Sequence, residues 1–185
     1  AGAIGILTLA AAKEAGALKT ILIGAPRSRL ELGKEFGADV TINIEEVPDP
    51  DERVRMVKDE TLGGYGADVF FECSGVPAAI PEGLNMLRRG GIYVEPGHFT
   101  DHGEVAINPF RDIVNKQSII VGVWGSSTPH FVFGRAIIES GKYPFAELVS
   151  HKLPLERVSD GIDAIGKTYR IDGEEIRKVA IMANS

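Results

Sequence analysis

Short apolar runs rich in β-branched residues alternate along the chain with longer stretches whose apolar positions recur at the helical period. The runs that predict β-strands are residues 20–24, 40–44, 67–72, 91–97 and 118–125. The stretches that predict helices are residues 6–17, 27–38, 49–64 and 78–91. This alternation indicates an α/β fold with a doubly wound parallel sheet. Because the strands are apolar nearly throughout, we expect helices to cover both faces of the sheet.

The first residues, AGAIG, form a glycine-rich turn in front of the first predicted helix. Such a turn bares the first backbone N–H groups of the helix, so that a phosphate can bind to them at the positive end of the helix dipole. Dinucleotide-binding folds use the pattern G-x-G-x-x-G after a buried strand. Gly2 and Gly5 have the spacing of its second and third glycines. The alternative interpretation is a flexible terminus in front of an alanine-rich helix.

The predicted sheet has a gap at its centre. In the dinucleotide-binding order 3-2-1-4-5-6, the first strand lies between the second and the fourth and precedes the glycine turn. A sheet without that strand leaves buried backbone groups unpaired at about 1–3 kcal/mol each, against a total stability of about 5–15 kcal/mol for a domain. We therefore expect this Rossmann fold to lack its first strand here, and the natural polypeptide to extend upstream of Ala1.

Composition and charge argue against several classes of protein. The chain of 185 residues is 44% hydrophobic and 25% charged, as is usual for a globular protein. Its net charge of −6 and the lack of basic runs interleaved with aromatic residues argue against a nucleic-acid partner. No apolar run reaches the roughly 18 residues of a membrane span, so no membrane contact is expected. The single cysteine, Cys73, rules out a disulfide framework and fits the reducing cytoplasm.

Six segments occur in the order and at the spacing of one enzyme family. They read GAIGILTLAAAKEAGA, LELGKEFGADVTIN, GADVFFECSG, MLRRGGIYVEPG, INPF and VGVWG. The chain thus resembles the cofactor-binding half of the medium-chain, zinc-type alcohol dehydrogenases. The resemblance implies a dinucleotide-binding domain at residues 1–143, truncated at its start, and a segment at residues 144–185 that returns to a catalytic domain. It also implies that an N-terminal domain not included here carries the zinc, so no catalytic or metal-binding residue is assigned to this chain.

The resemblance further assigns contacts to a nicotinamide dinucleotide. The implied positions are Gly2 and Gly5 at the pyrophosphate, Cys73 and Ser74 on the adenine side of the cleft, Gly97 and His98 at the nicotinamide carboxamide, Val123 beside the nicotinamide, and Arg177 at a cofactor phosphate. A guanidinium suits a phosphate because it can bind two oxygens at once.

The end of the second strand departs from the pattern of an NAD-specific enzyme. Such an enzyme usually has an acid there that accepts hydrogen bonds from the ribose hydroxyls, whereas this chain has Gly24. Arg27, Ser28 and Arg29 follow, and together they could bind a 2′-phosphate. The pattern favours NADP over NAD as the cofactor. The alternative interpretation is that these arginines are solvated at the start of a helix.

One pair of histidines has a spacing that a metal site could use. His98 and His102 stand four residues apart, which on a helix would suit a metal ion. Pro96, Gly97 and Gly103 instead predict a loop in this part of the chain. We therefore assign no metal to these histidines.

The resemblance implies hydride transfer between an alcohol or polyol and nicotinamide, with zinc polarising the alcohol oxygen. The alternatives are a zinc-free reductase of the quinone or enoyl type and a dinucleotide-binding module without chemistry. A cysteine and a G-H-E-type segment upstream would favour the first function. By itself, the chain is expected to bind the cofactor and not to catalyse. A homodimer or larger homo-oligomer is expected, with two copies pairing through the apolar strand at residues 118–123.

Overall fold

The computed structural model describes residues 1–183. They form two units, of which the first comprises Ala1–Arg135 and the second begins at Ala136. Helix α5 (Thr128–Glu139) runs across this division. Within residues 1–183, no helix combines the length and the apolar character needed to cross a bilayer.

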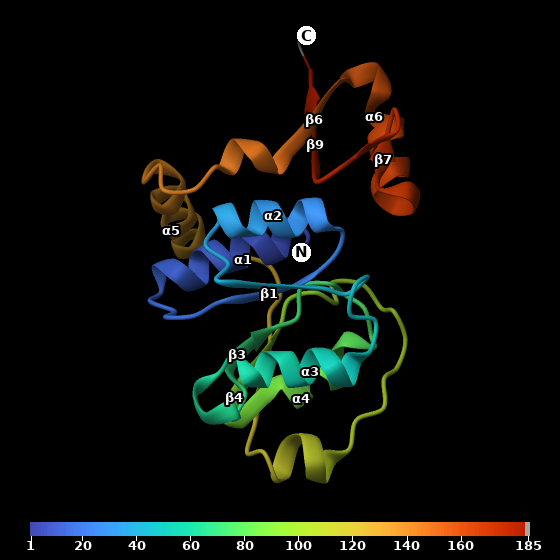
Figure 1. Ribbon diagram of the computed structural model, residues 1–185. Helices are drawn as coiled ribbons and strands as arrows, with labels where there is room; N and C mark the ends of the chain where they lie inside the picture. Colours follow the sequence, from blue (N-terminus) through green and yellow to red (C-terminus); the bar gives the residue numbers. More distant parts are fainter. Residues whose placement is uncertain (184–185) are drawn as a thin grey trace. The chain divides into compact units, whose positions relative to one another are not determined.

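The first unit contains two parallel sheets (Figure 1). Strand β1 (Ile21–Gly24) pairs with β2 (Val40–Asn43). Strand β4 (Leu87–Glu95) lies between β3 (Ala67–Phe71) and β5 (Ile119–Gly122). In the described residues, β1 pairs with no strand but β2, and β3 with no strand but β4. The predicted α/β fold with parallel strands is confirmed, and the break between β1 and β3 falls where the sequence predicts the gap.

Four helices alternate with the strands of this unit: the first precedes β1, and the other three connect β1 to β2, β2 to β3 and β3 to β4. They are α1 (Ala3–Glu14), α2 (Arg27–Glu35), α3 (Pro50–Asp59) and α4 (Ala79–Met86), and two short helical turns, η1 (Leu62–Gly64) and η2 (Pro109–Val114), lie in the connections. Asp49 caps α3, because its side chain accepts a hydrogen bond from the Asp51 backbone N–H at 3.0 Å. Helices α1 and α2 contact β1, whereas α4 contacts β3 and β4 (Figure 1).

One hydrophobic cluster holds the two sheets together. Ile42 of β2, Val54 and Val57 of α3, and Met86 of α4 are its buried members. Side chains from β1 and β3 pack against the same cluster. Beside it, the Arg53 guanidinium of α3 makes a bidentate ion pair with Glu82 of α4, with both distances at 2.7 Å. The shared core and this largely buried ion pair join α3 to α4, and with them the two sheets.

Two expectations about this unit are wrong. The helix expected at residues 78–91 ends at Met86, because Leu87 already pairs with Ala67 and begins β4. Strands β3 and β5 are also not covered on both faces: Val69 and Phe71 of β3 are 41% and 39% exposed, and every residue of β5 is exposed. Val69 and Phe71 point to the same side of β3 because alternate residues of a strand share a face. No described element covers that face fully.

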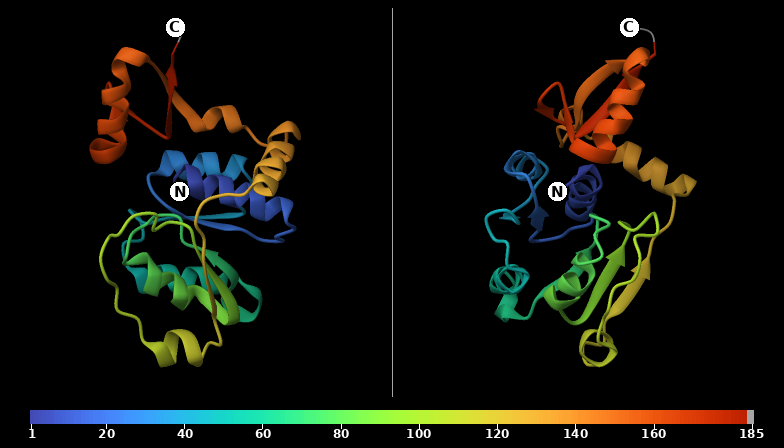
Figure 2. Two further views of the ribbon diagram at one scale, coloured as in Figure 1. Left: turned by 180° about the vertical axis from the view of Figure 1, so that it is seen from behind. Right: turned by 90° about the vertical axis from the view of Figure 1, so that its right-hand side faces the viewer.

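The second unit is a small α/β assembly of its own. Strand β6 (Val149–Pro154) pairs in parallel with β9 (Lys178–Met182), as Figures 1 and 2 show. The remaining elements are η3 (Phe145–Leu148), η4 (Leu155–Arg157), α6 (Val158–Asp163), η5 (Ala164–Thr168) and the short antiparallel pair β7 (Arg170–Ile171) and β8 (Glu174–Glu175). The core consists of Leu153, Ala164, Ile171 and Ile176.

Candidate functional site

The N-terminal end of α1 is open toward surrounding space. Gly2 is the N-cap of this helix, with φ −82° and ψ 179°, and no side chain of the described residues caps it. A Cβ atom built on Gly2 would meet nothing within 4 Å. Gly5 lies in the first turn, where a Cβ would stand 3.7 Å from the Cβ of Cys73. The prediction that both glycines lie at a helix N-terminus is confirmed, and an anion can approach its exposed N–H groups.

The carboxyl ends of β1 and β3 both lie against this part of α1. The amino group of Ala1 donates to the Ile23 carbonyl of β1 at 3.2 Å. On the other side, the Thr8 hydroxyl lies 3.8 Å from the Cys73 sulfur, just beyond the end of β3. In open α/β sheets, ligands bind outside the carboxyl ends of the strands, at the position where the strand order reverses. Burial raises the pKa of the Cys73 thiol, which keeps it protonated at neutral pH.

The loop after β3 is held by the buried carboxylate of Glu72, which is 2% exposed. Its Oε1 accepts hydrogen bonds from the Ser74 backbone N–H, at 2.7 Å, and from the Ser74 hydroxyl. Its Oε2 accepts from the Gly75 backbone N–H at 2.9 Å. A Cβ on Gly97 would lie only 2.0 Å from this oxygen, so the next loop approaches closely. Glu72 therefore fixes the loop that contains Ser74.

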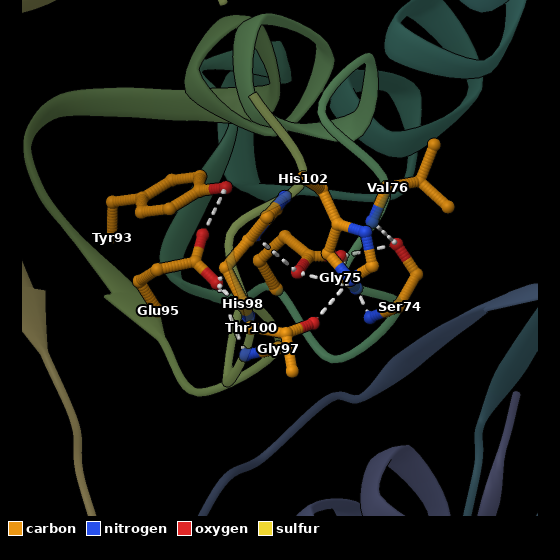
Figure 3. A network of polar contacts seen from close by, with 10 residues as sticks. Ser74, Gly75, Val76, Tyr93, Glu95, Gly97, His98, Thr100 and His102 are labelled. Carbon is orange, nitrogen blue, oxygen red and sulfur yellow. Dashed lines mark hydrogen bonds and ion pairs between the residues drawn. The ribbon is translucent and has the colours of Figure 1, made fainter. Parts of the chain in front are cut away.

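The loop after β4 is held in the same way by Glu95 (Figure 3). Glu95 Oε1 accepts from the Gly97 backbone N–H at 3.0 Å, from the His98 backbone N–H at 3.1 Å and from the His98 ring Nδ1 at 3.0 Å. His98 Nδ1 is also 3.5 Å from Glu72 Oε2, so the imidazole bridges the two carboxylates. The Tyr93 hydroxyl donates to Glu95 Oε2 at 3.3 Å, and burial raises the pKa of Tyr93. One polar network thus ties the two loops together.

Glu72, Glu95 and His98 are the only group of three potential metal ligands within residues 1–183 whose ligand atoms lie within 4.8 Å of one another. This arrangement does not fit a zinc ion, because His98 Nδ1, the ring nitrogen that faces both carboxylates, donates its hydrogen to Glu95 and so has no lone pair for a metal.

The histidine pair lies in a loop, as predicted from its prolines and glycines. The rings of His98 and His102 lie edge to face with centroids 6.1 Å apart, and His102 Nε2 is bonded to the Thr100 hydroxyl at 2.7 Å. The buried Nε2 of His98 has no hydrogen-bond partner among the described residues.

The residues expected at a 2′-phosphate lie at the N-terminal end of α2. Arg27, Ser28 and Arg29 form its first turn, directly after the end of β1 at Gly24. The Arg27 side chain is 72% exposed and forms an ion pair with Glu46, with Nη2 2.6 Å and Nε 3.2 Å from Oε1. This hydrogen bond raises the pKa of Arg27 and lowers the pKa of Glu46. Arg27 is therefore at the surface, as expected if these arginines are solvated, but it is paired with Glu46.

The other predicted positions lie in different places. The Val123 backbone N–H donates to the Glu95 carbonyl at 3.2 Å, which puts Val123 beside the end of β4. Arg177 belongs to the second unit, where its backbone N–H donates to the Ser150 hydroxyl at 2.9 Å. Its assignment to a cofactor phosphate stays a prediction. Sequence reasoning missed Glu72, Glu95 and Glu46; the one available signal was the position of Glu72 and Glu95 at strand ends.

Comparisons with known proteins point to one family. The family profile described as zinc-binding dehydrogenase matches residues 3–136. Erythritol/L-threitol dehydrogenase of Mycolicibacterium smegmatis is 35% identical over 183 residues, which are 98% of this chain and 46% of that protein. L-threonine 3-dehydrogenase of Bacillus velezensis is 35% identical over 171 residues, which are 90% of this chain and 46% of that protein.

A solved structure is similar over nearly the whole chain. The crystal structure of an alcohol dehydrogenase from Thermotoga maritima superposes on this chain with a TM-score of 0.88 and 31% sequence identity. The matched part is 98% of this chain and 47% of the Thermotoga maritima chain. The chain therefore spans about half the length of the relatives that it matches.

Proposed function

The chain belongs to the zinc-binding dehydrogenase family, and we propose that it is the cofactor-binding part of an NAD(P)-dependent, zinc-type alcohol or polyol dehydrogenase. The chain corresponds to the C-terminal part of relatives that are named as dehydrogenases of erythritol, threonine and other alcohols. When bound, the nicotinamide supplies the acceptor or donor of the hydride. The chain's own residues bind the dinucleotide and orient it.

The observation that carries this proposal is the open N-terminus of α1, which lies at the carboxyl ends of β1 and β3. Gly2 leaves room for a pyrophosphate in front of the first-turn N–H groups. Ser74 would line the adenine side of the cleft, and Gly97 and His98 would meet the nicotinamide carboxamide. The network of Glu72 and Glu95 supports these roles because it holds both loops in fixed positions.

The zinc ion of the proposed enzyme is assigned to residues outside those described here, because Glu72, Glu95 and His98 do not fit it. The single cysteine supports a reducing compartment, the cytoplasm, as the location.

Titration of the protein with NAD⁺ and NADP⁺ tests the proposal, and Gly2→Val gives the decisive variant. Its side chain would enter the space that the pyrophosphate needs, so binding of both cofactors should weaken by at least about tenfold. Gly134→Val is the matched control, because a Cβ there also meets nothing within 4 Å and valine suits a helix better than glycine. Cofactor binding that is equal in wild type and Gly2→Val would contradict the proposal.

NADP is the proposed preferred cofactor. Arg27, Ser28 and Arg29 lie at the positive end of the α2 dipole, where a 2′-phosphate would be stabilised. A charge-assisted contact contributes about 1.5–3 kcal/mol, which corresponds to a preference of about one to two orders of magnitude. Arg27→Ala and Arg29→Ala should each reduce this preference, and wild-type protein that binds NAD⁺ as tightly as NADP⁺ would contradict it.

Gly24→Asp, the obvious reversal of this preference, is a poor test. A Cβ on Gly24 would stand 2.4 Å from the backbone nitrogen of Ala1, so the substitution would displace the glycine turn itself. Weaker binding by that variant would not separate a steric effect at the pyrophosphate from an effect on the ribose.

We propose a homodimer that pairs through residues 118–123. Ile119, Ile120 and Val121 of β5 are 54%, 47% and 40% exposed, and β5 pairs within this chain with β4 alone among the described strands. An apolar edge strand of this kind is available to a second copy across a two-fold axis. Light scattering should give the dimer mass for wild type and the monomer mass for Ile120→Lys. A wild-type monomer would contradict this assembly.

A further inference from the structure

We propose that Glu46 determines how strongly this site discriminates between NADP and NAD, because its carboxylate competes with the 2′-phosphate for the Arg27 guanidinium. The inference rests on the proposed function and adds to it a residue outside the segment of Gly24, Arg27, Ser28 and Arg29. Glu46 lies in the turn after β2, nineteen residues beyond Arg27 in the sequence.

The contacts of Glu46 all converge on one oxygen. Its Oε1 accepts from Arg27 Nη2 at 2.6 Å, from Arg27 Nε at 3.2 Å and from Asn43 Nδ2 at 3.1 Å. Asn43 is itself fixed at the end of β2, where its Oδ1 accepts from the Glu45 backbone N–H at 3.0 Å. The carboxylate is thereby held on the edge of the guanidinium that a phosphate would bind.

The surroundings of this ion pair form a shallow pocket of about 160 Å³. Two basic and two acidic side chains line it, namely Arg27, Lys34, Glu31 and Glu46. Lys34 Nζ is paired with Glu31 at 2.9 and 3.1 Å. Each cation is therefore already matched by an anion, and the four charges sum to zero. While Glu46 is charged, a dianionic 2′-phosphate therefore gains less attraction from Arg27 than it would from a guanidinium without a carboxylate partner.

The ion pair is weak enough for a ligand to displace it. Glu46 is 52% exposed and Arg27 72% exposed, so water and salt screen their attraction. A phosphate can take the guanidinium from Glu46, but it then lies close to an unpaired carboxylate, whose repulsion lowers its affinity. NAD⁺ carries no 2′-phosphate and escapes this repulsion. The carboxylate thus acts selectively against NADP, as a repulsive determinant of specificity.

Glu46→Gln removes the charge and keeps an oxygen that can accept from Asn43. Because the residue is half-exposed, the fold should tolerate the change. We expect the variant to bind NADP⁺ about three- to tenfold more tightly than wild type, with little change for NAD⁺. The effect is modest because solvent screens interactions between exposed charges.

The matched control is Glu60→Gln. Glu60 also forms an exposed ion pair, with Lys19, and its loss changes the net charge by the same amount. Lys19 lies before the start of β1, whereas Arg27 follows the end of the same strand, so the two ion pairs are at opposite ends of β1. A general effect of net charge on anionic ligands would therefore appear equally in both variants, whereas competition at Arg27 appears only in Glu46→Gln.

Calorimetric titration of wild type, both variants and the double variant Arg27→Ala/Glu46→Gln with NADP⁺ and NAD⁺ completes the test. Relative to wild type, the preference for NADP⁺ should rise in Glu46→Gln and stay unchanged in Glu60→Gln. In the Arg27→Ala background, which lowers the preference by itself, adding Glu46→Gln should give no further gain. If wild type binds neither cofactor, the proposed function itself fails and the inference with it. If both bind and Glu46→Gln leaves their ratio unchanged, or tightens NADP⁺ equally without Arg27, the inference alone is overturned.

Discussion

Replacing Glu72 by glutamine should destabilise the fold and loosen both loops at the proposed cofactor site. The carboxylate is 2% exposed and accepts hydrogen bonds from the Ser74 N–H, the Ser74 hydroxyl and the Gly75 N–H. A glutamine has one acceptor oxygen instead of two. Its NH₂ group would face either the Ser74 N–H or the Gly75 N–H, and two donors cannot pair.

The magnitude follows from these contacts. A hydrogen bond to a charged group contributes about 1.5–3 kcal/mol, and a buried donor left unpaired costs about 1–3 kcal/mol. Since the Ser74 and Gly75 donors cannot both keep full bonds to a glutamine, we expect a loss of about 2–4 kcal/mol in the free energy of unfolding. That is a large part of the about 5–15 kcal/mol that stabilises a typical domain.

Equilibrium unfolding in urea, followed by circular dichroism, measures this loss. Glu52→Gln is the control, because Glu52 is exposed on α3 and its change should stay within about 0.5 kcal/mol of wild type. Below the unfolding transition, Glu72→Gln should also bind the dinucleotide more weakly, since the loop of Ser74 is no longer fixed. A variant with the stability of wild type would refute the role given to the network.

Three further results are expected. Arg53→Met leaves the largely buried Glu82 carboxylate without its bidentate partner and should cost about 3–5 kcal/mol of unfolding free energy in urea. Burial lowers the pKa of Lys116 to about 8, below its ordinary 10.5. The unfolded chain then binds more protons between these values, so stability should rise from pH 8 to 10.5, and Lys116→Gln should remove that part of the rise. The Cys73 thiol, whose pKa is raised by burial, should react with a disulfide reagent at pH 7 more slowly than free cysteine; an equal rate would contradict its environment.

The sequence predicts those features that local pattern determines. The β-branched runs at β1, β2 and β3 identify the strands, and their separation by helices implies parallel pairing. Gly2 in front of an apolar helical stretch identifies the start of α1. The exposed face of β3 could not be predicted, because Val69 and Phe71 are apolar whether or not an element covers them.

The polar contacts at the candidate site have no such local signal. Glu72 and His98 are distant in sequence and meet because β3 and β4 are neighbours in one sheet. Arg27 and Glu46 likewise meet because β1 and β2 are paired. A cluster of charges assembled by tertiary structure can be recognised only once the strand order and the loop positions are known.

A crystal structure of the protein with NADP⁺ is the decisive measurement for the proposed binding site. We expect the pyrophosphate in front of the α1 N-terminus, in contact with the backbone at Gly2, and the 2′-phosphate beside Arg27 with Glu46 turned away. A dinucleotide bound elsewhere on the protein, with the space before Gly2 filled only by solvent, would contradict it.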